Sequence, residues 1–493
     1  MSSHGLNMKI PVSRIIDQLW TPASVMVLAP LFVKAWMDFD PSWDSWSYHL
    51  PYAGRLWGIV PAESYRMEQF LEDYYLGLPK LGEWLQGMFW TASGHLQAAN
   101  LVCLSSLVLY ALFLRVRFGL PFGASSISLL AIPLVQIHVT SCYVDLPGNL
   151  ALSALILLTW QLFHRTELRP RRDVLPLFPP AMIAAHFKFQ LIPVVLMILL
   201  IALAIIILLI RSVLLTGARS SGKNWRWLAF GAFMAFLTFY VPIKNAKLYG
   251  NPFYPLRITI GPIVLNHRQP LYWDSPQYLH DSLPPERWLF SVLEINRPFG
   301  AWQIGQLALP VQSEANRMGG FFGVYVVLQL TFLLVFCVGT GHFDIDSIVY
   351  FGLISMIASW LPQSHELRYY LFWMITLVTL NLILLYRGNR AQPLRIIIPT
   401  ANLTALLVVI LLTKGFYILP QGITLDNLPM HIKQLEPFPW VPASVDHQVL
   451  ERIRPHDDVC IAGQQPITWL YASHFHPPKS YRIVAALDAQ ACK

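Results

Sequence analysis

Long apolar segments alternate with short polar ones along almost the whole chain. A helix needs roughly 17–25 apolar residues to cross the hydrocarbon core of a bilayer. Windows of this kind predict membrane-spanning helices at residues 19–37, 97–114, 121–140, 146–163, 189–210, 227–243, 320–338, 346–361, 368–386 and 395–413. A shorter apolar piece at residues 175–187 predicts either a tilted crossing or a half-span.

The distribution of basic residues tests this set of helices. Lys and Arg concentrate in polar segments that would all lie on one side of the membrane, at residues 9–14, 115–117, 165–172, 211–226 and 387–395. Such segments face the cytoplasm in most membrane proteins. If the short piece at 175–187 did not cross, the segment 211–226 would fall on the opposite side, so the pattern favours about eleven crossings. The N-terminus is then cytoplasmic, with an uncleaved signal anchor, and the C-terminus is extracytoplasmic.

This topology gathers the remaining polar segments on the extracytoplasmic face. They are a first outer loop at residues 38–96, turns at 141–145, 186–190 and 362–368, a large outer loop at 244–319 and a tail at 416–493. Charged and apolar residues alternate at helical spacing around Pro79, which predicts two short interfacial helices within residues 65–90. Residues 459–462 and 481–486 read as two strands. The predicted fold is an all-α polytopic membrane domain at residues 1–415, followed by a small mixed C-terminal segment at 416–493.

The composition agrees with this fold class. The chain has 493 residues, of which 55% are hydrophobic and 13% charged, whereas soluble domains carry about 25% charged residues. A formal net charge of +8 could indicate a nucleic-acid partner, but the basic residues lie between apolar segments, so this class is excluded. Five cysteines give neither a disulfide framework nor a metal-binding spacing, although Cys460 and Cys492 could pair in an extracytoplasmic tail. No phosphate-binding loop, zinc spacing, nucleophile elbow or cofactor fingerprint occurs.

The segment WDSWSYHLP, at residues 43–51, opens the first outer loop and carries the main candidate for chemistry. Asp44 is flanked by tryptophan rings, which would exclude water and raise the basicity of its carboxylate. His49 is a second candidate for proton transfer, although a histidine in such a turn is more often a structural residue. Tyr48 lies between them in the sequence as a candidate ligand contact.

Two further ionisable residues stand at the ends of predicted spans, where such groups are functional hypotheses. Asp145 precedes Pro147 in YVDLPGN, so it could instead cap the helix that begins there. Lys188 lies in AHFKFQ between His186 and Gln190. This polar notch predicts a binding role, and the alternative is a lysine that merely extends to the lipid headgroups.

Arg368 occupies a comparable position in HELRYY, at the start of a late span. A guanidinium can bind two phosphate oxygens at once, and His365 lies within one turn of it. The competing interpretation is a structural ion pair between Arg368 and Glu366.

Taken in order, these motifs resemble bacterial members of the GT-C superfamily of glycosyltransferases, which include relatives of protein mannosyltransferases and the aminoarabinose transferase of lipid A. The resemblance covers about residues 15–415 and rests on WDSWSYHLP, YVDLP, AHFKFQ, KNAKLYGNPFYPL (Lys244–Leu256), RMGGFFG (Arg317–Gly323) and HELRYY. It implies a multi-pass protein of the bacterial inner membrane that uses a polyprenyl-phosphate sugar as donor. The acceptor would be an envelope glycan, lipid or protein.

The resemblance also implies roles for individual residues. Asp44 takes the place of the first-loop catalytic aspartate, and Asp145 that of the aspartate before the fourth span. Lys188 and Arg368 would bind the lipid phosphate, and further donor contacts are expected from Tyr48, Gln190 and His365. Many relatives have an adjacent Asp-Glu pair where this chain has Asp44-Ser45. This departure argues against a protein mannosyltransferase and leaves a divalent metal possible rather than required.

Three other functions remain as alternatives. A polyprenyl-linked lipid or sugar flippase would also need many spans, but the two halves of the chain show no matching pattern. A polymerase or ligase of surface glycans would still be a transferase, and a non-catalytic scaffold would have no use for the ionisable residues above. The sequence therefore favours an inverting glycosyltransferase with Asp44 as general base, without identifying the sugar or the acceptor.

Overall fold

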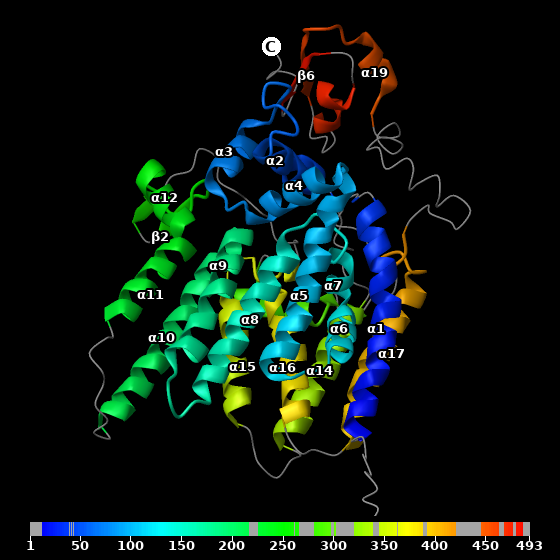
Figure 1. The fold of residues 1–493 in the computed structure, drawn as a ribbon. Coiled ribbons are helices and arrows are strands. Elements are labelled where there is room, and N and C mark those ends of the chain that lie inside the picture. Colours follow the sequence, from blue (N-terminus) through cyan, green and yellow to red (C-terminus); the bar gives the residue numbers. More distant parts are fainter. Residues whose placement is uncertain are drawn as a thin grey trace, which may run out of the picture.

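The structure is a computed structural model of a mostly helical protein (Figure 1). It describes residues 12–38, 40, 42, 44–215, 225–260, 262–265, 281–296, 300–301, 320–338, 345–361, 363–387, 392–420, 445–462, 468–476 and 480–486.

A bundle of helices forms the body of the molecule, and a smaller layer of helices and short strands covers one end of it (Figure 1). The bundle helices are α1 (Val12–Met37), α5 (Leu101–Phe118), α6 (Phe122–Leu130), α7 (Pro133–His138), α8 (Asp145–Phe163), α9 (Phe178–Phe187), α10 (Ile192–Leu215), α11 (Trp225–Thr238), α14 (Phe321–Val338), α15 (Ile345–Trp360), α16 (Phe372–Arg387) and α17 (Gln392–Leu412). Short helical turns join several of them, namely η2 (Leu96–Asn100), η3 (Pro170–Val174), η4 (Leu175–Leu177) and η5 (Phe189–Leu191).

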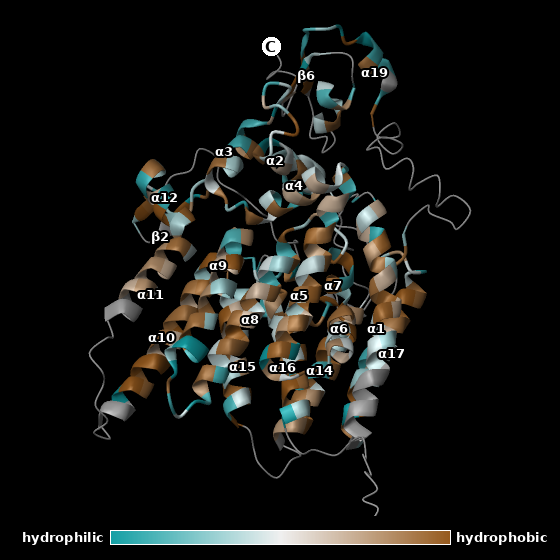
Figure 2. Ribbon diagram, viewed as in Figure 1, coloured by the Kyte–Doolittle hydropathy of each residue, from teal (hydrophilic) through white to brown (hydrophobic). Residues whose placement is uncertain are grey.

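The apolar character of these helices makes this a membrane-embedded protein. Among the described residues, five helical stretches are long and apolar enough to cross a bilayer: Trp20–Met37, Leu96–Phe118, Asp145–Phe163, Phe189–Arg211 and Pro393–Leu412. Shorter apolar stretches are Ala229–Thr238, Phe321–Cys337, Ile345–Trp360 and Phe372–Arg387. Hydrophobic residues follow the bundle helices along their length, and hydrophilic residues are concentrated beyond their ends (Figure 2). The predicted helices are thus present, whereas the predicted total of about eleven crossings stays a prediction.

Two predicted spans differ in their internal structure. The span predicted at residues 227–243 is divided at Phe239 between α11 and α12 (Tyr240–Tyr249). The span predicted at residues 121–140 is the second. It is divided into α6 and α7, and Pro133 is the first residue of the second helix. Proline has no backbone N–H to donate and clashes with the preceding turn, so a helix that reaches it ends or kinks. The short piece predicted at 175–187 contains η4 and the ten-residue helix α9.

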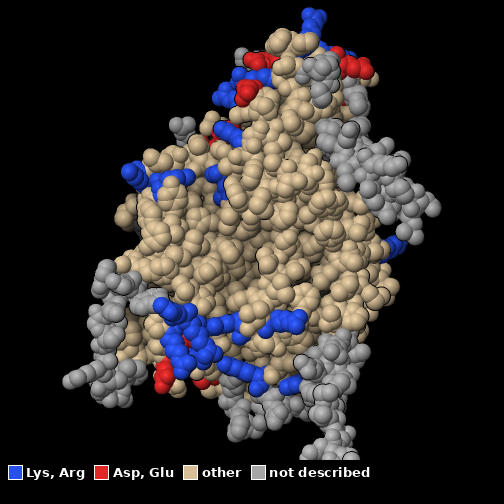
Figure 3. All heavy atoms as spheres, in the orientation of Figure 1, with Lys and Arg blue, Asp and Glu red and all other residues tan. Residues whose placement is uncertain are grey.

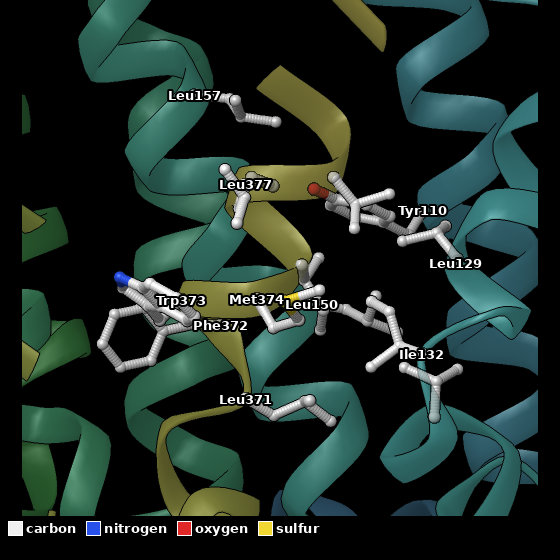
Figure 4. Packing of buried hydrophobic residues seen from close by; sticks show 14 of the residues in the cluster. Tyr110, Leu129, Ile132, Leu150, Leu157, Leu371, Phe372, Trp373, Met374 and Leu377 are labelled. Atoms are coloured by element: carbon white, nitrogen blue, oxygen red, sulfur yellow. The ribbon is translucent and has the colours of Figure 1, made fainter. Parts of the chain in front are cut away.

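Helix α8 lies in the middle of the bundle, in contact with α5, α9, α10 and α16. Leu150 and Leu157 of α8 face Leu371, Met374 and Leu377 around the start of α16 (Figure 4). Gly148 lets α9 and η5 approach closely, because a Cβ there would lie 3.0 Å from Leu191 Cδ1.

A network of polar side chains crosses the bundle among the apolar residues. Asn402 donates to Ser128 Oγ at 2.7 Å and accepts from Gln329 at 2.8 Å and from the Tyr325 hydroxyl at 3.1 Å. Asn381 donates to the side-chain oxygen of Gln329 at 2.9 Å. These bonds connect α6, α14, α16 and α17, and hydrogen bonds between spans stabilise helix association in membranes.

The outer layer is built largely from the first outer loop. It contains the π-helical turn η1 (Ser45–His49), followed by α2 (Leu50–Leu56), β1 (Tyr65–Arg66), α3 (Gln69–Gly77) and α4 (Leu81–Ser93). The two short helices predicted around Pro79 are therefore present as α3 and α4, and their interfacial position stays a prediction. Further along the chain lie α12 (Tyr240–Tyr249), β2 (Ile258–Ile260), β3 (Ile263–Leu265), α13 (Pro284–Val292), β4 (Ile295–Asn296), β5 (Gly300–Ala301) and η7 (Leu367–Tyr370).

The C-terminal segment rests on this first outer loop (Figure 1). It contains α19 (His447–Arg452), β6 (Asp458–Ala462), η9 (Thr468–Tyr471), η10 (Ser473–Phe475) and β7 (Arg482–Ala486). Strand β7 pairs in parallel with β6 on one side and with β1 on the other, with Tyr65 opposite Ile483. The two predicted strands are thus confirmed as β6 and β7. Cys460 is disulfide-bonded, and its predicted partner Cys492 lies outside the described residues.

The two ends of the molecule carry different sets of charged side chains. In Figure 3, Lys and Arg gather at the end of the bundle opposite the outer layer, and residues of other kinds cover the middle. The basic residues there include Arg115 and Arg117 in the last turn of α5, and Arg117 donates to the Arg172 carbonyl at 2.9 Å. The outer layer carries both signs of charge.

Candidate functional site

An ion pair joins the first outer loop to the start of a late helix. Arg368 lies in η7, immediately before α16, and its Nη1 is 2.9 Å from Asp44 Oδ2. Asp44 directly precedes the π-helical turn η1. Because the backbone bonds of such a turn run from residue i to i+5, Tyr48 and His49 come round to the same side as Asp44. Burial raises the pKa of the Tyr48 phenol well above its usual value, so Tyr48 keeps its proton.

A second ion pair lies where α8 and α9 meet. Lys188 Nζ is 2.9 Å from Asp145 Oδ1, and the Asp145 side chain is fully buried. Asp145 is the first residue of α8, and Lys188 follows the last residue of α9. The sequence left capping and chemistry open for Asp145, and no hydrogen bond of its carboxylate to the helix backbone is found in the described part of the chain.

Aromatic rings connect the two pairs into one cluster. Lys188 Nζ lies 4.7 Å from the centroid of the Tyr369 ring, and the Arg368 guanidinium carbon lies 5.0 Å from the same centroid. Arg368 also lies 5.2 Å from the centroid of Tyr143, whose phenol pKa is raised, chiefly by burial. The faces of such rings attract cations. We refer to Asp44, Arg368, Asp145 and Lys188 as the ion-pair cluster.

Asn149 fixes the backbone beneath this cluster. Its side-chain amide donates to the Asp145 carbonyl at 2.8 Å and to the Arg368 carbonyl at 3.1 Å, and it accepts from the Phe372 N–H at 2.8 Å. It thereby holds the start of α8 against η7, although 219 residues separate the two in the sequence. Asn149 is not among the residues predicted from the sequence, because a polar residue one turn into an apolar helix carries no signal of its partner.

Asp40 holds the turn that carries Asp44. The Cys142 backbone N–H donates to Asp40 Oδ2 at 2.8 Å, and Trp46 Nε1 donates to the Asp40 carbonyl at 2.5 Å. Ser45 Oγ also donates to the Asp40 carboxylate. A loop carboxylate that accepts several local hydrogen bonds orders its own backbone. Asp40 therefore positions Asp44 rather than belonging to the cluster itself.

His49 forms a separate buried pair with α4. Its Nδ1 is 2.7 Å from Glu83 Oε1, and its ring lies 4.2 Å from that of Tyr48. Within the described residues, His49 Nε2 has no hydrogen-bond partner. Glu83 is not among the residues predicted from the sequence. The one feature of the sequence that could have indicated Glu83 is its position in an amphipathic helix, on the same side as Gln86. Gln86 donates to the Cys142 carbonyl at 2.6 Å.

The remaining predicted residues are not part of the cluster. The His186 ring pairs with the Leu237 carbonyl at 2.8 Å. Gln190 lies in η5, half-buried, and its side chain makes no hydrogen bond in the described part of the chain. His365 lies 4.0 Å from Glu366, and burial lowers its pKa. Arg368 thus pairs with Asp44, and the alternative pairing with Glu366 is not found. Trp43 lies outside the described residues.

Two cavities open on the bundle away from the cluster. One, of about 640 Å³, is lined by residues of α4, α9 and α11, among them Trp84 and His186, and by Lys80 before α4 and Tyr240 at the start of α12. The other, of about 680 Å³, is lined almost entirely by apolar residues of α14 and α17. Neither set of lining residues includes a member of the ion-pair cluster.

Among the described residues, no three His, Cys, Asp or Glu side chains are grouped so as to hold a metal ion. Comparisons with family models, with curated proteins and with solved structures found no match. The fold and the site define a helical membrane protein with a buried cluster of alternating charges beneath its outer layer.

Proposed function

We propose that this protein is a membrane glycosyltransferase that moves a sugar from a polyprenyl-phosphate donor to an envelope glycan, lipid or protein acceptor. The ion-pair cluster is the observation that carries this proposal. Charges are costly to bury beside a membrane, and those that persist there mark functional sites. Transfer from a lipid phosphate needs a carboxylate as base and cations for the phosphate, and the cluster contains both.

The proposed reaction is a direct displacement. The acceptor hydroxyl attacks the anomeric carbon, its proton passes to the Asp44 carboxylate, and the bond from that carbon to the phosphate oxygen breaks. The phosphate leaves as a stable anion and needs no proton of its own, unlike the leaving group in the two-carboxylate glycosidases. Arg368 and Lys188 stabilise the charge that develops on it. The anomeric configuration inverts, and Asp145 keeps Lys188 in place.

We further propose a location and an orientation for the protein. The cluster would face the outside of a bacterial inner membrane, with the N-terminus cytoplasmic, the C-terminus extracytoplasmic and about eleven crossings between them. The gathering of Lys and Arg at the end of the bundle opposite the outer layer supports this orientation (Figure 3). Apolar helices beside the cluster suit a donor whose long hydrocarbon tail stays in the bilayer.

The test is release of the carrier phosphate. Membranes that contain wild type, Asp44→Asn or Glu167→Gln receive a panel of polyprenyl-phosphate sugars, with total envelope extract as the source of acceptors. We expect free polyprenyl phosphate from one donor, lost in Asp44→Asn at equal protein level. Glu167 is 77% exposed at the opposite end of the bundle, so Glu167→Gln should match wild type. Equal release from wild type and Asp44→Asn would remove Asp44 as the base.

A flippase is the second candidate, and the polar network around Asn402 favours it. Polar side chains inside an apolar bundle can line a path for a headgroup, and Tyr325 of this network also lines the larger cavity. If no donor releases its carrier phosphate, while the same lipids cross vesicles that contain the protein, the flippase replaces the transferase.

A further inference from the structure

The ion-pair cluster contains as many negative as positive groups. Asp44 and Asp145 face Arg368 and Lys188 at 2.9 Å in each pair, so the formal charges cancel. Both cations lie against the Tyr369 ring, and all four residues are largely buried. A lipid phosphate that entered this cluster unchanged would add an uncompensated negative charge. Such a charge is strongly unfavourable where little water reaches it.

The two pairs differ in how readily they could open. The Asp145 side chain is fully buried and that of Lys188 is 9% exposed, whereas the exposed fractions are 9% for Asp44 and 17% for Arg368. Asp145 also starts α8, next to backbone fixed by Asn149. Asp44 instead lies in the outer layer, on the turn before α2. An anion that reaches the cluster from outside therefore meets the Asp44–Arg368 pair first.

We infer that the Asp44 carboxylate occupies the position on Arg368 at which an oxygen of the substrate phosphate binds. Phosphate binding then displaces Asp44 from Arg368. This inference rests on the proposed function and adds an order of events to it. Guanidinium binds carboxylate and phosphate with the same geometry, so one can replace the other without rebuilding the site. The exchange keeps a single anion on Arg368 at any time, and the displaced Asp44 carboxylate becomes the group without a cation.

The exchange also links binding to chemistry. In the ion pair, Asp44 Oδ2 already accepts a hydrogen bond from Arg368 Nη1 at 2.9 Å, so the guanidinium engages this oxygen. Once phosphate has taken its place on Arg368, Asp44 lies beside the ligand without its cation. The base thus becomes available only when the donor is bound, which limits activation of water in the empty site.

The test measures the affinity of the full-length protein for farnesyl phosphate in detergent, with farnesol as the probe for the tail alone. If Asp44 competes with phosphate, Asp44→Asn should bind farnesyl phosphate about tenfold more tightly than wild type, with unchanged affinity for farnesol. Asp44→Ala should do the same, which guards against a specific effect of asparagine. Arg368→Gln should lose the preference for the phosphate, and Glu167→Gln should match wild type. Thermal unfolding establishes that each variant is folded.

The outcomes separate this inference from the proposed function. Equal or weaker binding by folded Asp44→Asn and Asp44→Ala would overturn the exchange. If Arg368→Gln still lost the phosphate preference, the proposed phosphate site would survive. No phosphate preference in wild type or in any variant would count against both.

Discussion

Lys188 and Asp145 contribute to stability mainly through the ion pair that they form with each other. Their charged atoms are 2.9 Å apart, and neither side chain is more than 9% exposed. Removing one partner of a buried pair leaves an uncompensated charge and costs roughly 3–5 kcal/mol, whereas replacing both is often nearly neutral. The stability of the pair and its proposed binding role can therefore be separated by mutation.

We expect Lys188→Gln to lower the free energy of unfolding by about 3–5 kcal/mol because it leaves Asp145 buried and alone. The double variant Asp145→Asn/Lys188→Gln should recover most of this loss while remaining inactive in carrier-phosphate release. Thermal unfolding in detergent gives the first comparison and the release assay the second. Lys247→Gln, at an exposed position of α12, is the matched control. A double variant as unstable as Lys188→Gln would contradict the expectation.

Lys80 provides a second test, through pH. It lies outside the apolar spans, between α3 and α4, where it donates to the carbonyls of Tyr75 and Leu78. Burial lowers its pKa to about 8, from an ordinary value of 10.5. Between these values the unfolded state binds more protons than the folded state, so this residue makes stability rise with pH.

The unfolding temperature of wild type should accordingly rise relative to that of Lys80→Met as the pH increases from 8 to 10. Below pH 8 both states of wild type hold the proton, and the difference between the two proteins should be constant. Parallel curves for the two proteins across pH 8–10 would show that the Lys80 ammonium is not disfavoured by folding.

At the scale of elements, the close approach of α1 and α6 depends on Gly123. A Cβ at this position would clash with the backbone carbonyl of Trp20 on α1. Gly352, on α15, has no atom within 4 Å of a Cβ built there. The two glycines therefore make a matched pair, each within an apolar helix of the same bundle.

Gly123→Ala should destabilise the protein by roughly 1–3 kcal/mol, because backbone cannot move aside as a flexible side chain can. Gly352→Ala should be neutral or stabilise by up to about 1 kcal/mol, since alanine is the better helix former. Thermal unfolding of both variants against wild type is the measurement. The packing of α1 on α6 would be in doubt if the two variants behaved alike.

The elements also show what the sequence could and could not predict. The amphipathic spacing around Pro79 predicted α3 and α4, because a repeat of apolar positions follows directly from helix geometry. The division of the predicted span 121–140 into α6 and α7 is indicated in the sequence only by one residue, Pro133. The π-helical turn after Asp44 has no such repeat, since its bonding pattern occurs once. The sequence likewise selected Asp44 and Arg368 individually, but their pairing depends on tertiary contacts between segments 324 residues apart.

At the scale of the whole molecule, the C-terminal segment shares a hydrophobic core with the first outer loop. Trp469 is 1% exposed, and its ring lies 6.1 Å from that of Trp46 and 6.0 Å from that of Trp90. Trp46 is also the residue that donates to Asp40 beneath the Asp44 turn. The C-terminal segment therefore supports the wall of the candidate site, a role that was not predicted from the sequence.

Trp469→Ala should loosen this contact, since truncating a buried tryptophan typically costs about 3–5 kcal/mol. We expect faster amide hydrogen exchange in β7 and in the turn after Asp44, measured by mass spectrometry on the intact chain. Trp84→Ala is the control, because the Trp84 side chain is 45% exposed. Unchanged exchange in both regions would mean that Trp469 does not hold the two parts together.

The pairing of β1 with β7 has a consequence for synthesis of the protein. Tyr65 leaves the ribosome early and Ile483 near the end, yet the two are neighbours in one sheet. The first outer loop therefore lacks the middle strand of this sheet until the helices that follow it have been made. Chains fold progressively as they emerge, so a nascent chain that stops before β7 cannot complete the structure around Asp44. Premature termination would thus yield a protein whose candidate site is incomplete, and synthesis of β7 controls when this site first forms.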